Sequence, residues 1–382
     1  MKIIVLDIAA SKTGALSILR DFARFLTENP DENEWIFVTG GKDAIPDSYT
    51  ASHPAIKVIE RSDVKASWGS RLIFEHLSGA GFLRELQPDI VFSLENTLPQ
   101  GDLRLPGGRK MRQVLYVHQP LGFQSQKNFS FLKRDERHLA IYQHLISKEI
   151  EASCRRADRV IVQTAWMREA VARKCRIGLD KISIVTPDIS LPANVDDANP
   201  PSAGLLKTTN KTDVSNASFF YPAGAIYYKN HELVCRSARL LLERGVDNFN
   251  IYFTLNKKDL PWIADLIPNQ IHFIGPISRE EVFKRYRDSI LLFPSYIETF
   301  GFPLAEARAV GAPILAADTP FARELLASYG NAEFFDFQDE RSLADLMEAY
   351  IRGRKKPIRT AASPSPPPSR SSYAELREVI LH

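Results

Sequence analysis

Residues 293–318 read FPSYIETFGFPLAEARAVGAPILAAD, and this stretch indicates how the chain folds. Its pattern is typical of a strand, a loop, a helix and a second strand. The helix is predicted over 303–310, because Pro303 suits the first helical position and Gly311 suits the left-handed residue that follows a helix. A helix that connects two buried strands is the unit of a parallel α/β sheet.

The same alternation of apolar runs and amphipathic stretches recurs along the chain. A first series of strands is predicted at 3–6, 35–38, 56–59, 90–92, 114–117, 159–162 and 182–185. A second series is predicted at 219–221, 250–253, 271–274, 290–293, 313–316 and 333–335. Two such series predict an α/β protein with two doubly wound, Rossmann-like domains.

The domain limits follow from composition. Residues 1–186 form the predicted N-terminal domain, and 187–216, which are polar and contain Pro192, Pro200 and Pro201, form a linker. The second domain is predicted over 217–356. Residues 357–382 begin with a Ser/Pro-rich loop and end in a short amphipathic helix that must pack against one of the domains.

The bulk composition excludes several classes of protein. The 49 basic and 46 acidic residues are too evenly balanced to indicate a nucleic-acid partner. No apolar run is long enough to span a bilayer, and the start of the sequence shows no signal-peptide pattern, so a cytoplasmic location is expected. Cys154, Cys175 and Cys235 lack metal-ligand spacing and are predicted to be reduced packing residues.

The loop before the predicted helix carries the chemistry. The amides of Phe300, Gly301 and Phe302 lie at the helix N-terminus, where unpaired N–H groups and the helix dipole suit a diphosphate. Glu298 and Glu306 have seven residues between them, and carboxylates bind the hydroxyls of sugars and ribose. The alternative is that Glu298 is a solvated loop residue and Glu306 an acid favoured by the helix dipole.

Two glutamates at this spacing around Phe-Gly-Phe-Pro resemble the signature of family 4 retaining glycosyltransferases of GT-B fold. Residues 157–167 resemble that family's last N-domain strand and the helix after it. Residues 221–230 resemble the glycine-and-lysine loop that opens the donor domain, and 271–277 the segment that frames the nucleotide base. The resemblance implies two Rossmann-like domains facing a central cleft, with the C-terminal helix crossing back to the N-domain.

The resemblance also implies roles for individual residues. Glu298 would bind the transferred sugar, Glu306 the nucleotide ribose, and Lys229 the departing diphosphate. The remaining donor contacts would come from Gly224, Thr299, Phe300, Gly301 and Phe302, with Pro276 and Ile277 at the base. A lone loop lysine is otherwise simply solvated.

In the N-terminal half, the resemblance assigns His118 to the sugar and the acceptor, and Gly14 to the phosphates. A lone histidine at a strand end can equally be structural, and one glycine is a weak signal. The chain departs from the family in two places: Gly14 stands where a glycine pair is common, and Ala225 stands in place of an arginine. Lys12 is a candidate for supplying the missing positive charge.

The chain contains no Asp-x-Asp triplet, so we expect a transferase that needs neither a metal nor another cofactor. The resemblance implies transfer with retention from a UDP- or GDP-hexose to a saccharide or a polyprenyl-diphosphate-linked saccharide. In bacteria, such proteins build capsule, exopolysaccharide or O-antigen. A basic and aromatic segment at 126–138 could rest on an anionic membrane, or could be a solvated helix over core aromatics.

Two other interpretations stay open. The chain could be a non-catalytic subunit that binds sugar nucleotides, or an epimerase or hydrolase without a glycosyl acceptor. A phosphorylase is disfavoured, because the chain is short and shows no pyridoxal-lysine context.

Overall fold

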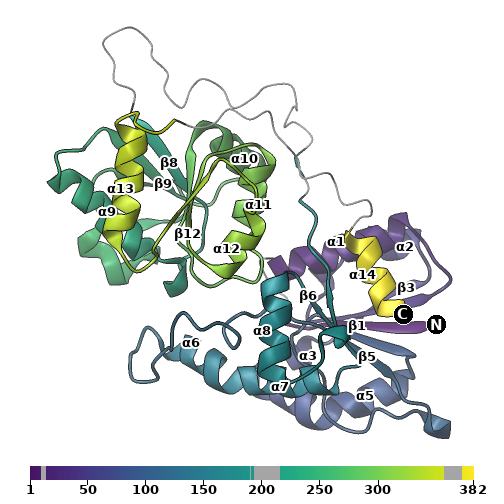
Figure 1. Ribbon diagram of the computed structural model, residues 1–382. Helices are drawn as coiled ribbons and strands as arrows, with labels where there is room; N and C mark the ends of the chain where they lie inside the picture. Colours follow the sequence, from purple (N-terminus) through teal and green to yellow (C-terminus); the bar gives the residue numbers. More distant parts are fainter. Residues whose placement is uncertain (10–13, 190, 193–215, 357–371) are drawn as a thin grey trace. The chain divides into compact units, whose positions relative to one another are not determined.

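The computed structural model describes residues 1–9, 14–189, 191–192, 216–356 and 372–382. Within them the chain forms two compact units (Figure 1). Unit 1 holds the described residues of 1–133, 137–187 and 370–382, and unit 2 those of 134–136 and 188–369. Most of the predicted linker and nearly all of the Ser/Pro-rich stretch lie outside the described residues.

Unit 1 is built on a fully parallel sheet of seven strands in the order β3-β2-β1-β4-β5-β6-β7. The strands are β1 (Lys2–Asp7), β2 (Glu34–Thr39), β3 (Ile56–Glu60), β4 (Ile90–Ser93), β5 (Arg112–Tyr116), β6 (Arg159–Val162) and β7 (Ile182–Ile184). The strand order reverses between β1 and β4, which pair in register from Ile3 with Ile90 to Leu6 with Ser93. In sheets of this kind, ligands bind beyond the carboxyl ends of the strands at such a reversal.

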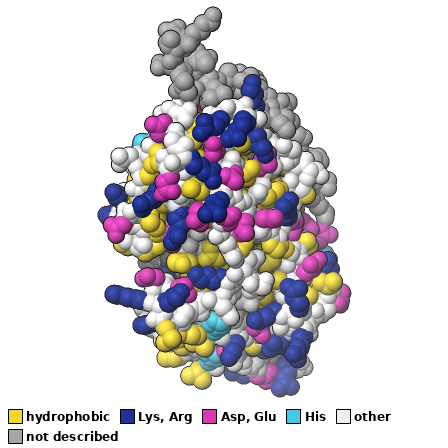
Figure 2. Space-filling model, turned by 60° about the vertical axis from the view of Figure 1, so that its left-hand side comes forward, with side chains coloured by type: hydrophobic (Ala, Val, Ile, Leu, Met, Phe, Trp, Pro, Cys, Tyr) yellow, Lys and Arg dark blue, Asp and Glu magenta, His cyan; other side chains and the backbone are white. Residues whose placement is uncertain are grey.

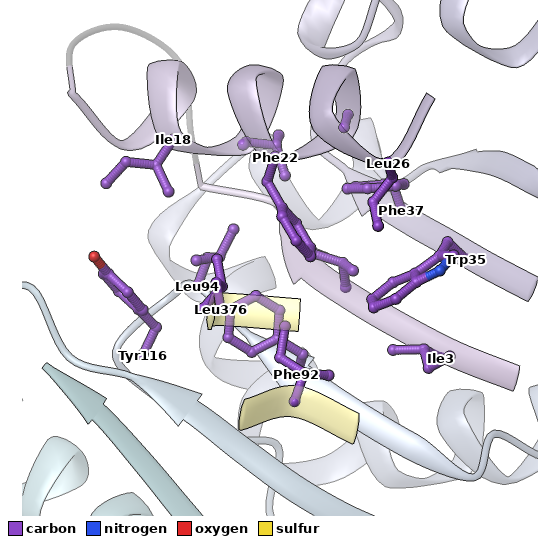
Figure 3. Close-up of a cluster of buried hydrophobic side chains, with 14 of the residues drawn as sticks. Ile3, Ile18, Phe22, Leu26, Trp35, Phe37, Phe92, Leu94, Tyr116 and Leu376 are labelled. Atoms are coloured by element: carbon purple, nitrogen blue, oxygen red, sulfur yellow. The ribbon is translucent and has the colours of Figure 1, made fainter. Parts of the chain in front are cut away.

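Helices cover both faces of this sheet. They are α1 (Gly14–Glu28), α2 (Asp47–Ser52), α3 (Ser62–Lys65), α4 (Trp68–Ile73), α5 (Gly79–Leu86), α6 (Arg137–Ile141), α7 (Ser147–Arg156) and α8 (Ala165–Cys175). Two π-helical turns, η2 (Phe74–Ser78) and η4 (Tyr142–Ile146), continue α4 and α6. Side chains alternate along β1, so that Ile3 and Val5 enter one core while Ile4 and Leu6 enter another. Figure 3 shows the first core, where Phe22 of α1 lies among side chains from the strands.

The C-terminal helix α14 (Ser372–Leu381) belongs to unit 1, as expected of a helix that crosses back to the N-domain. It lies beside α1 (Figure 1). Leu376 and Ile380 are buried in the same core as Phe22, and the ring of Tyr373 stacks on that of Phe22 at 6.3 Å. Arg377 Nη1 donates to the carbonyl oxygen of Asn29, 2.7 Å away.

Unit 2 has a second parallel sheet, in the order β10-β9-β8-β11-β12-β13. Its strands are β8 (Ala217–Tyr221), β9 (Phe249–Phe253), β10 (Ile271–Phe273), β11 (Ile290–Phe293), β12 (Ile314–Ala317) and β13 (Ala332–Phe335). The covering helices are α9 (His231–Glu243), α10 (Arg279–Asp288), α11 (Phe302–Ala309), α12 (Pro320–Leu325) and α13 (Glu340–Ile351). Here the strand order reverses between β8 and β11.

The helix after the diagnostic loop differs slightly from its prediction. It begins at Phe302 rather than Pro303, so proline occupies the second helical position. Gly301 precedes the helix and has φ of 90°, a left-handed conformation that glycine adopts without strain. This conformation turns the chain from the loop into the helix. Gly311 is left-handed as predicted, with φ of 74°. All three cysteines are buried and unpaired with one another by disulfides, as predicted.

Within the described residues, no helix combines the length and apolar character that a bilayer-spanning segment needs.

Candidate active site

The strongest constellation in unit 2 lies where the sheet order reverses. The loop after β8 leads through Gly224 to the short 3-10 helix η7 (Tyr227–Lys229), and the loop after β11 carries Ser295 and Glu298. The two loops are joined through their backbones, since the N–H of Tyr296 donates to the carbonyl oxygen of Tyr228 at 3.2 Å. The sheet therefore brings two distant sequence segments to one place at its ligand-binding edge.

Lys229 and Glu298 form an ion pair between these loops. Lys229 Nζ donates to Glu298 Oε1, and the Ser295 hydroxyl donates to the same oxygen at 2.8 Å. The two charged side chains are only 18% and 17% exposed. The Tyr221 hydroxyl donates to the carbonyl oxygen of Lys229 at 2.7 Å, which fixes the backbone beneath the amine. The result is a partly desolvated cation and anion held in place by neutral donors.

The buried groups around this pair are uncharged at neutral pH. Burial lowers the pKa of His231 to about 3, with a further contribution from Lys229. Burial also raises the pKa of Tyr221 and of Tyr228, so both phenols stay protonated. The charge offered to a ligand here is therefore that of Lys229 and Glu298.

Glu306 on α11 has a separate set of partners. Its Oε1 pairs with Arg279 Nη1 at 3.0 Å, and its Oε2 accepts a hydrogen bond from the Tyr286 hydroxyl at 3.0 Å. Burial raises the pKa of this carboxyl, and Arg279 and Tyr286 oppose the shift. Arg279 follows Ile277 closely in sequence, so α10 links the predicted base-binding segment to the predicted ribose ligand.

The other predicted donor contacts are placed as follows. Gly224 has open space where a Cβ would project, so nothing crowds the backbone there. Thr299, Phe300 and Gly301 lie in the loop before α11, and Phe302 is its first residue. Pro276 and Ile277 follow β10 after a turn at Gly275, whose φ is 69°. Gly14 begins α1, whereas Lys12 lies outside the described residues.

Unit 1 has a cavity of about 280 Å³ at its own reversal point. Residues that follow three strands line it: Ala9 after β1, Leu94 to Thr97 after β4, and His118 and Gln119 after β5. Glu75 and Tyr142, from the two π-helical turns, complete the wall together with neighbours from α4 and α7. The position of His118 on this wall agrees with its predicted place at a strand end.

Asn96 holds His118 by two hydrogen bonds. The backbone N–H of His118 donates to Asn96 Oδ1 at 2.7 Å. The side-chain nitrogen of Asn96 must therefore be the donor toward ring atom Nε2 of His118, 3.2 Å away. The ring hydrogen of neutral His118 is therefore on Nδ1, which finds no acceptor among the described residues. Burial lowers the pKa of His118 to about 4, so the ring is neutral at physiological pH.

Sequence reasoning singled out Lys229, Glu298, Glu306 and His118 as candidates and missed the side chains that orient them. Those partners are Ser295, Tyr286, Arg279 and Asn96. Asn96 could have been noticed as a polar residue just after a buried strand, but its left-handed backbone, with φ of 66°, has no signal in one sequence. The loops at 222–229 and 294–301 meet through Lys229 and Glu298, whereas Glu306 pairs with Arg279 and Tyr286.

Comparison with known proteins explains this arrangement. Residues 210–362 match the family model of glycosyl transferases group 1. The match lies in the C-terminal region of the chain. It contains Lys229, Glu298 and Glu306 together with the elements that position them.

Curated relatives extend the comparison. The O-antigen chain mannosyltransferase RfbU of Salmonella typhimurium is 21% identical over 205 residues, which is 50% of this chain and 51% of RfbU. The chain thus spans about half the length of this curated relative.

Solved structures show the fold of the whole chain, which is GT-B. The lipopolysaccharide outer core galactosyltransferase WaaB, in its apo form, matches with a TM-score of 0.62 at 18% identity, covering 100% of this chain and 99% of WaaB. Anabaena Alr3699/HepE in complex with UDP-glucose matches with a TM-score of 0.61 at 15% identity, covering 100% of this chain and 98% of that one.

Proposed function

We propose that this protein is a retaining, metal-independent hexosyltransferase that uses a nucleotide-diphosphate sugar. The observation that carries the proposal is the Lys229–Glu298 pair at the strand-order reversal of a glycosyl transferases group 1 domain. Lys229 supplies a positive charge for the diphosphate, and Glu298 supplies a carboxylate for the hydroxyls of the sugar. Ser295 holds the shared oxygen in place.

The donor is a UDP- or GDP-hexose. Its diphosphate lies at the N-terminus of α11, where the amides of Phe300, Gly301 and Phe302 and the helix dipole favour an anion. Glu306 accepts hydrogen bonds from the ribose hydroxyls, and Pro276 and Ile277 frame the base. The UDP-glucose found with the structurally similar HepE supports this class of donor.

The reaction needs stabilisation of a leaving diphosphate rather than a protein nucleophile. The acceptor hydroxyl attacks the face of the sugar that the diphosphate leaves, and the departing phosphate takes its proton. Lys229 and the helix end stabilise the charge that develops on the phosphate, which is the kind of fixed electrostatics that dominates many enzymes. Glu298 then acts as a binder of hydroxyls, and not as one of the paired carboxylates of a glycosidase.

The acceptor is a saccharide or a polyprenyl-diphosphate-linked saccharide in the synthesis of a bacterial surface polysaccharide such as O-antigen, exopolysaccharide or capsule. The name of RfbU, an O-antigen chain mannosyltransferase, supports this role. Enzymes that make such precursors work inside the cell, so a cytoplasmic protein at the inner face of the membrane is proposed.

Exposed apolar side chains in unit 1 support contact with the membrane. Phe131 and Leu132 are 43% and 92% exposed, whereas Phe129 of the same segment is buried and belongs to the interior. The ring of Phe131 lies against that of His144 at 5.5 Å. In the lower part of Figure 2, hydrophobic side chains gather beside histidines, and Lys and Arg are interspersed with Asp and Glu elsewhere on that face.

Sedimentation with vesicles tests this contact. We expect wild-type protein to bind vesicles that contain anionic lipid and Leu132→Asp to bind at least about tenfold more weakly, because an inserted leucine would be replaced by a charge. Equal binding by both proteins, or none by wild type, would exclude the membrane role for this segment.

The central experiment is a thermal-shift and donor-hydrolysis screen against UDP-, GDP-, dTDP- and ADP-sugars in the presence of EDTA. We expect one donor class to stabilise the wild-type protein and to be hydrolysed slowly. Glu298→Gln keeps the shape of the side chain and removes its charge, so hydrolysis should fall about a hundredfold. Glu333→Gln is the matched control, because Glu333 pairs with Lys355 at 2.5 Å elsewhere in unit 2.

Each outcome has a distinct meaning. Equal losses in Glu298→Gln and Glu333→Gln would remove the special role of Glu298. Hydrolysis that appears only when EDTA is left out would refute metal independence. Binding of a donor without turnover, even with saccharide acceptors, would favour a non-catalytic subunit, which the departures at Gly14 and Ala225 would allow.

A further inference from the structure

The cavity in unit 1 has more acidic than basic side chains in its wall, whereas the donor site pairs one lysine with one glutamate. Among the described residues, the cavity wall includes four carboxyl side chains, Asp7, Glu75, Glu95 and Glu149, and one cationic side chain, Arg71. Glu95 is only 5% exposed and Glu75 13%, so these carboxyls lie within the wall and not on the outer surface. A ligand in this cavity therefore meets mostly acidic groups.

The positive charge of Arg71 does not offset the negative charge of these carboxylates for an incoming anion. Arg71 Nε lies 3.1 Å from Glu75 Oε1, and Arg71 Nη2 lies 3.7 Å from Glu95 Oε1. Thr97 adds a hydrogen bond to Glu75 at 3.0 Å, which holds the glutamate on the arginine. A phosphate group that approached the guanidinium would face both carboxylates at close range, and their charges oppose its binding.

The remaining lining suits a neutral, hydroxyl-rich ring. Gln119 and Tyr142 offer uncharged donors and acceptors, and Trp68, which is 64% exposed, offers a flat apolar surface. At about 280 Å³, the cavity is at the lower end of the roughly 300–1,000 Å³ of small-molecule pockets, which suits a monosaccharide-sized group.

The local backbone also marks this cavity as functional. Both π-helical turns described in the chain contribute to its wall, η2 through Glu75 and η4 through Tyr142 and Ile146. Such turns are rare and occur frequently at functional sites, because the extra residue shifts side chains out of helical register. Here the shift places side chains of two separate helices on one cavity.

We propose that this cavity holds the terminal sugar of the acceptor as an uncharged ring, and that its carboxylates exclude an acceptor sugar that bears phosphate. The inference rests on the proposed transferase function and adds a selection rule to it. Any diphosphate of a lipid-linked acceptor would have to lie outside the cavity. Glu75 would accept hydrogen bonds from sugar hydroxyls while repelling an anion.

The test uses matched pairs of small acceptors with the full-length protein. Glucose, mannose and galactose are each compared with their 6-phosphates, by ligand-observed NMR for binding and by transfer from the donor that stabilises the protein. We expect at least one neutral hexose to be preferred over its phosphate about tenfold or more, from repulsion between like charges. In Glu75→Gln, where Arg71 is less neutralised, this preference should fall about tenfold.

Three further proteins make the result decisive. Glu34→Gln removes a carboxylate that pairs with Lys57 at the amino ends of β2 and β3, whereas the cavity lies beyond the carboxyl ends of the strands. This variant should leave the preference unchanged. Glu149→Gln, which alters a cavity carboxylate bonded to Gln100, replaces Glu75→Gln if that variant fails to fold. Glu95→Gln should also lower the preference.

Binding that favours a hexose phosphate, equal binding of both members, or binding of neither member of any pair would overturn the assignment. A donor-induced thermal shift measured on the same samples separates this failure from failure of the transferase proposal, because the donor groups lie in unit 2.

Discussion

Lys229 and Glu298 form a charged pair whose side chains are more than four-fifths buried, and such a pair has two consequences for its site. Removing one partner leaves a poorly solvated charge, which typically costs about 3–5 kcal/mol of stability in a buried pair. A bound donor could replace that partner, since its phosphates suit the lysine and its hydroxyls suit the glutamate. Variants at these positions should therefore be judged with donor present as well as absent.

His118 gives a residue-scale prediction about pH. A pKa of about 4 means that the ring is neutral above about pH 5, so its titration should not appear in the rate between about pH 5.5 and 8. His118→Phe should lower kcat/KM about tenfold, as expected for the loss of a hydrogen bond worth about 1.5 kcal/mol. The ratio of wild-type to variant kcat/KM should stay constant over that pH range.

A matched control exists for this variant. His272 lies 2.7 Å from the Asn250 side-chain oxygen through Nε2 and belongs to unit 2, so His272→Phe removes a comparable histidine–asparagine contact. A ratio that changes with an inflection near pH 6.5 for His118→Phe would show that the ring titrates normally. A loss as large in His272→Phe would show that the effect is structural.

At this scale, the sequence was informative where a functional residue follows a buried strand. Glu298, Lys229 and His118 could be singled out because strand ends are recognisable from apolar runs. Their partners could not, because a contact such as Asn96 with His118 or Arg279 with Glu306 depends on how distant segments meet. Local sequence carries almost no information about such pairings.

At the scale of elements, all thirteen strands lie within two residues of their predicted positions. Buried parallel strands read as continuous apolar runs, so their signal in the sequence is strong. The helix α11 was displaced by one residue, because either Phe302 or Pro303 can begin a helix after a left-handed glycine. The π-helical turns were not predicted, since an inserted residue leaves no mark on an amphipathic pattern.

Helix α14 gives a prediction at this scale. Leu376 is 2% exposed in the core shared with Phe22 and Trp35 (Figure 3), so Leu376→Ala should destabilise unit 1 by about 2–5 kcal/mol. Glu378→Ala alters an exposed side chain of the same helix and should change stability by less than about 0.5 kcal/mol. Urea unfolding followed by circular dichroism measures both, and equal effects would mean that the helix does not depend on its apolar face.

At the scale of the whole molecule, the chain has two sheets with separate cores, and its last helix belongs to the core of the first unit. The length of 382 residues already indicates two domains, because single cores rarely grow beyond about 250–300 residues. The sequence did not show which domain takes the last helix, since Leu376 and Ile380 would suit any apolar surface. The family resemblance supplied that expectation, and the packing on α1 confirms it.

This organisation predicts how ligand and mutation act on unfolding. A donor held by Lys229, Glu298 and Glu306 contacts unit 2, and at a hundred times its Kd it should stabilise that unit by about 2.7 kcal/mol. For a unit of this size, such a gain raises the melting temperature by about 5–10 °C.

Leu376→Ala should lower a different transition, because its side chain lies in unit 1. Differential scanning calorimetry of both proteins, with and without donor, should thus resolve one transition that responds to donor and one that responds to the substitution. If donor and substitution moved the same single transition, the two units would unfold as one cooperative structure. The assignment of donor binding to unit 2 would then be tested by Glu298→Gln. This variant should abolish the shift caused by donor and leave the shift caused by Leu376→Ala unchanged.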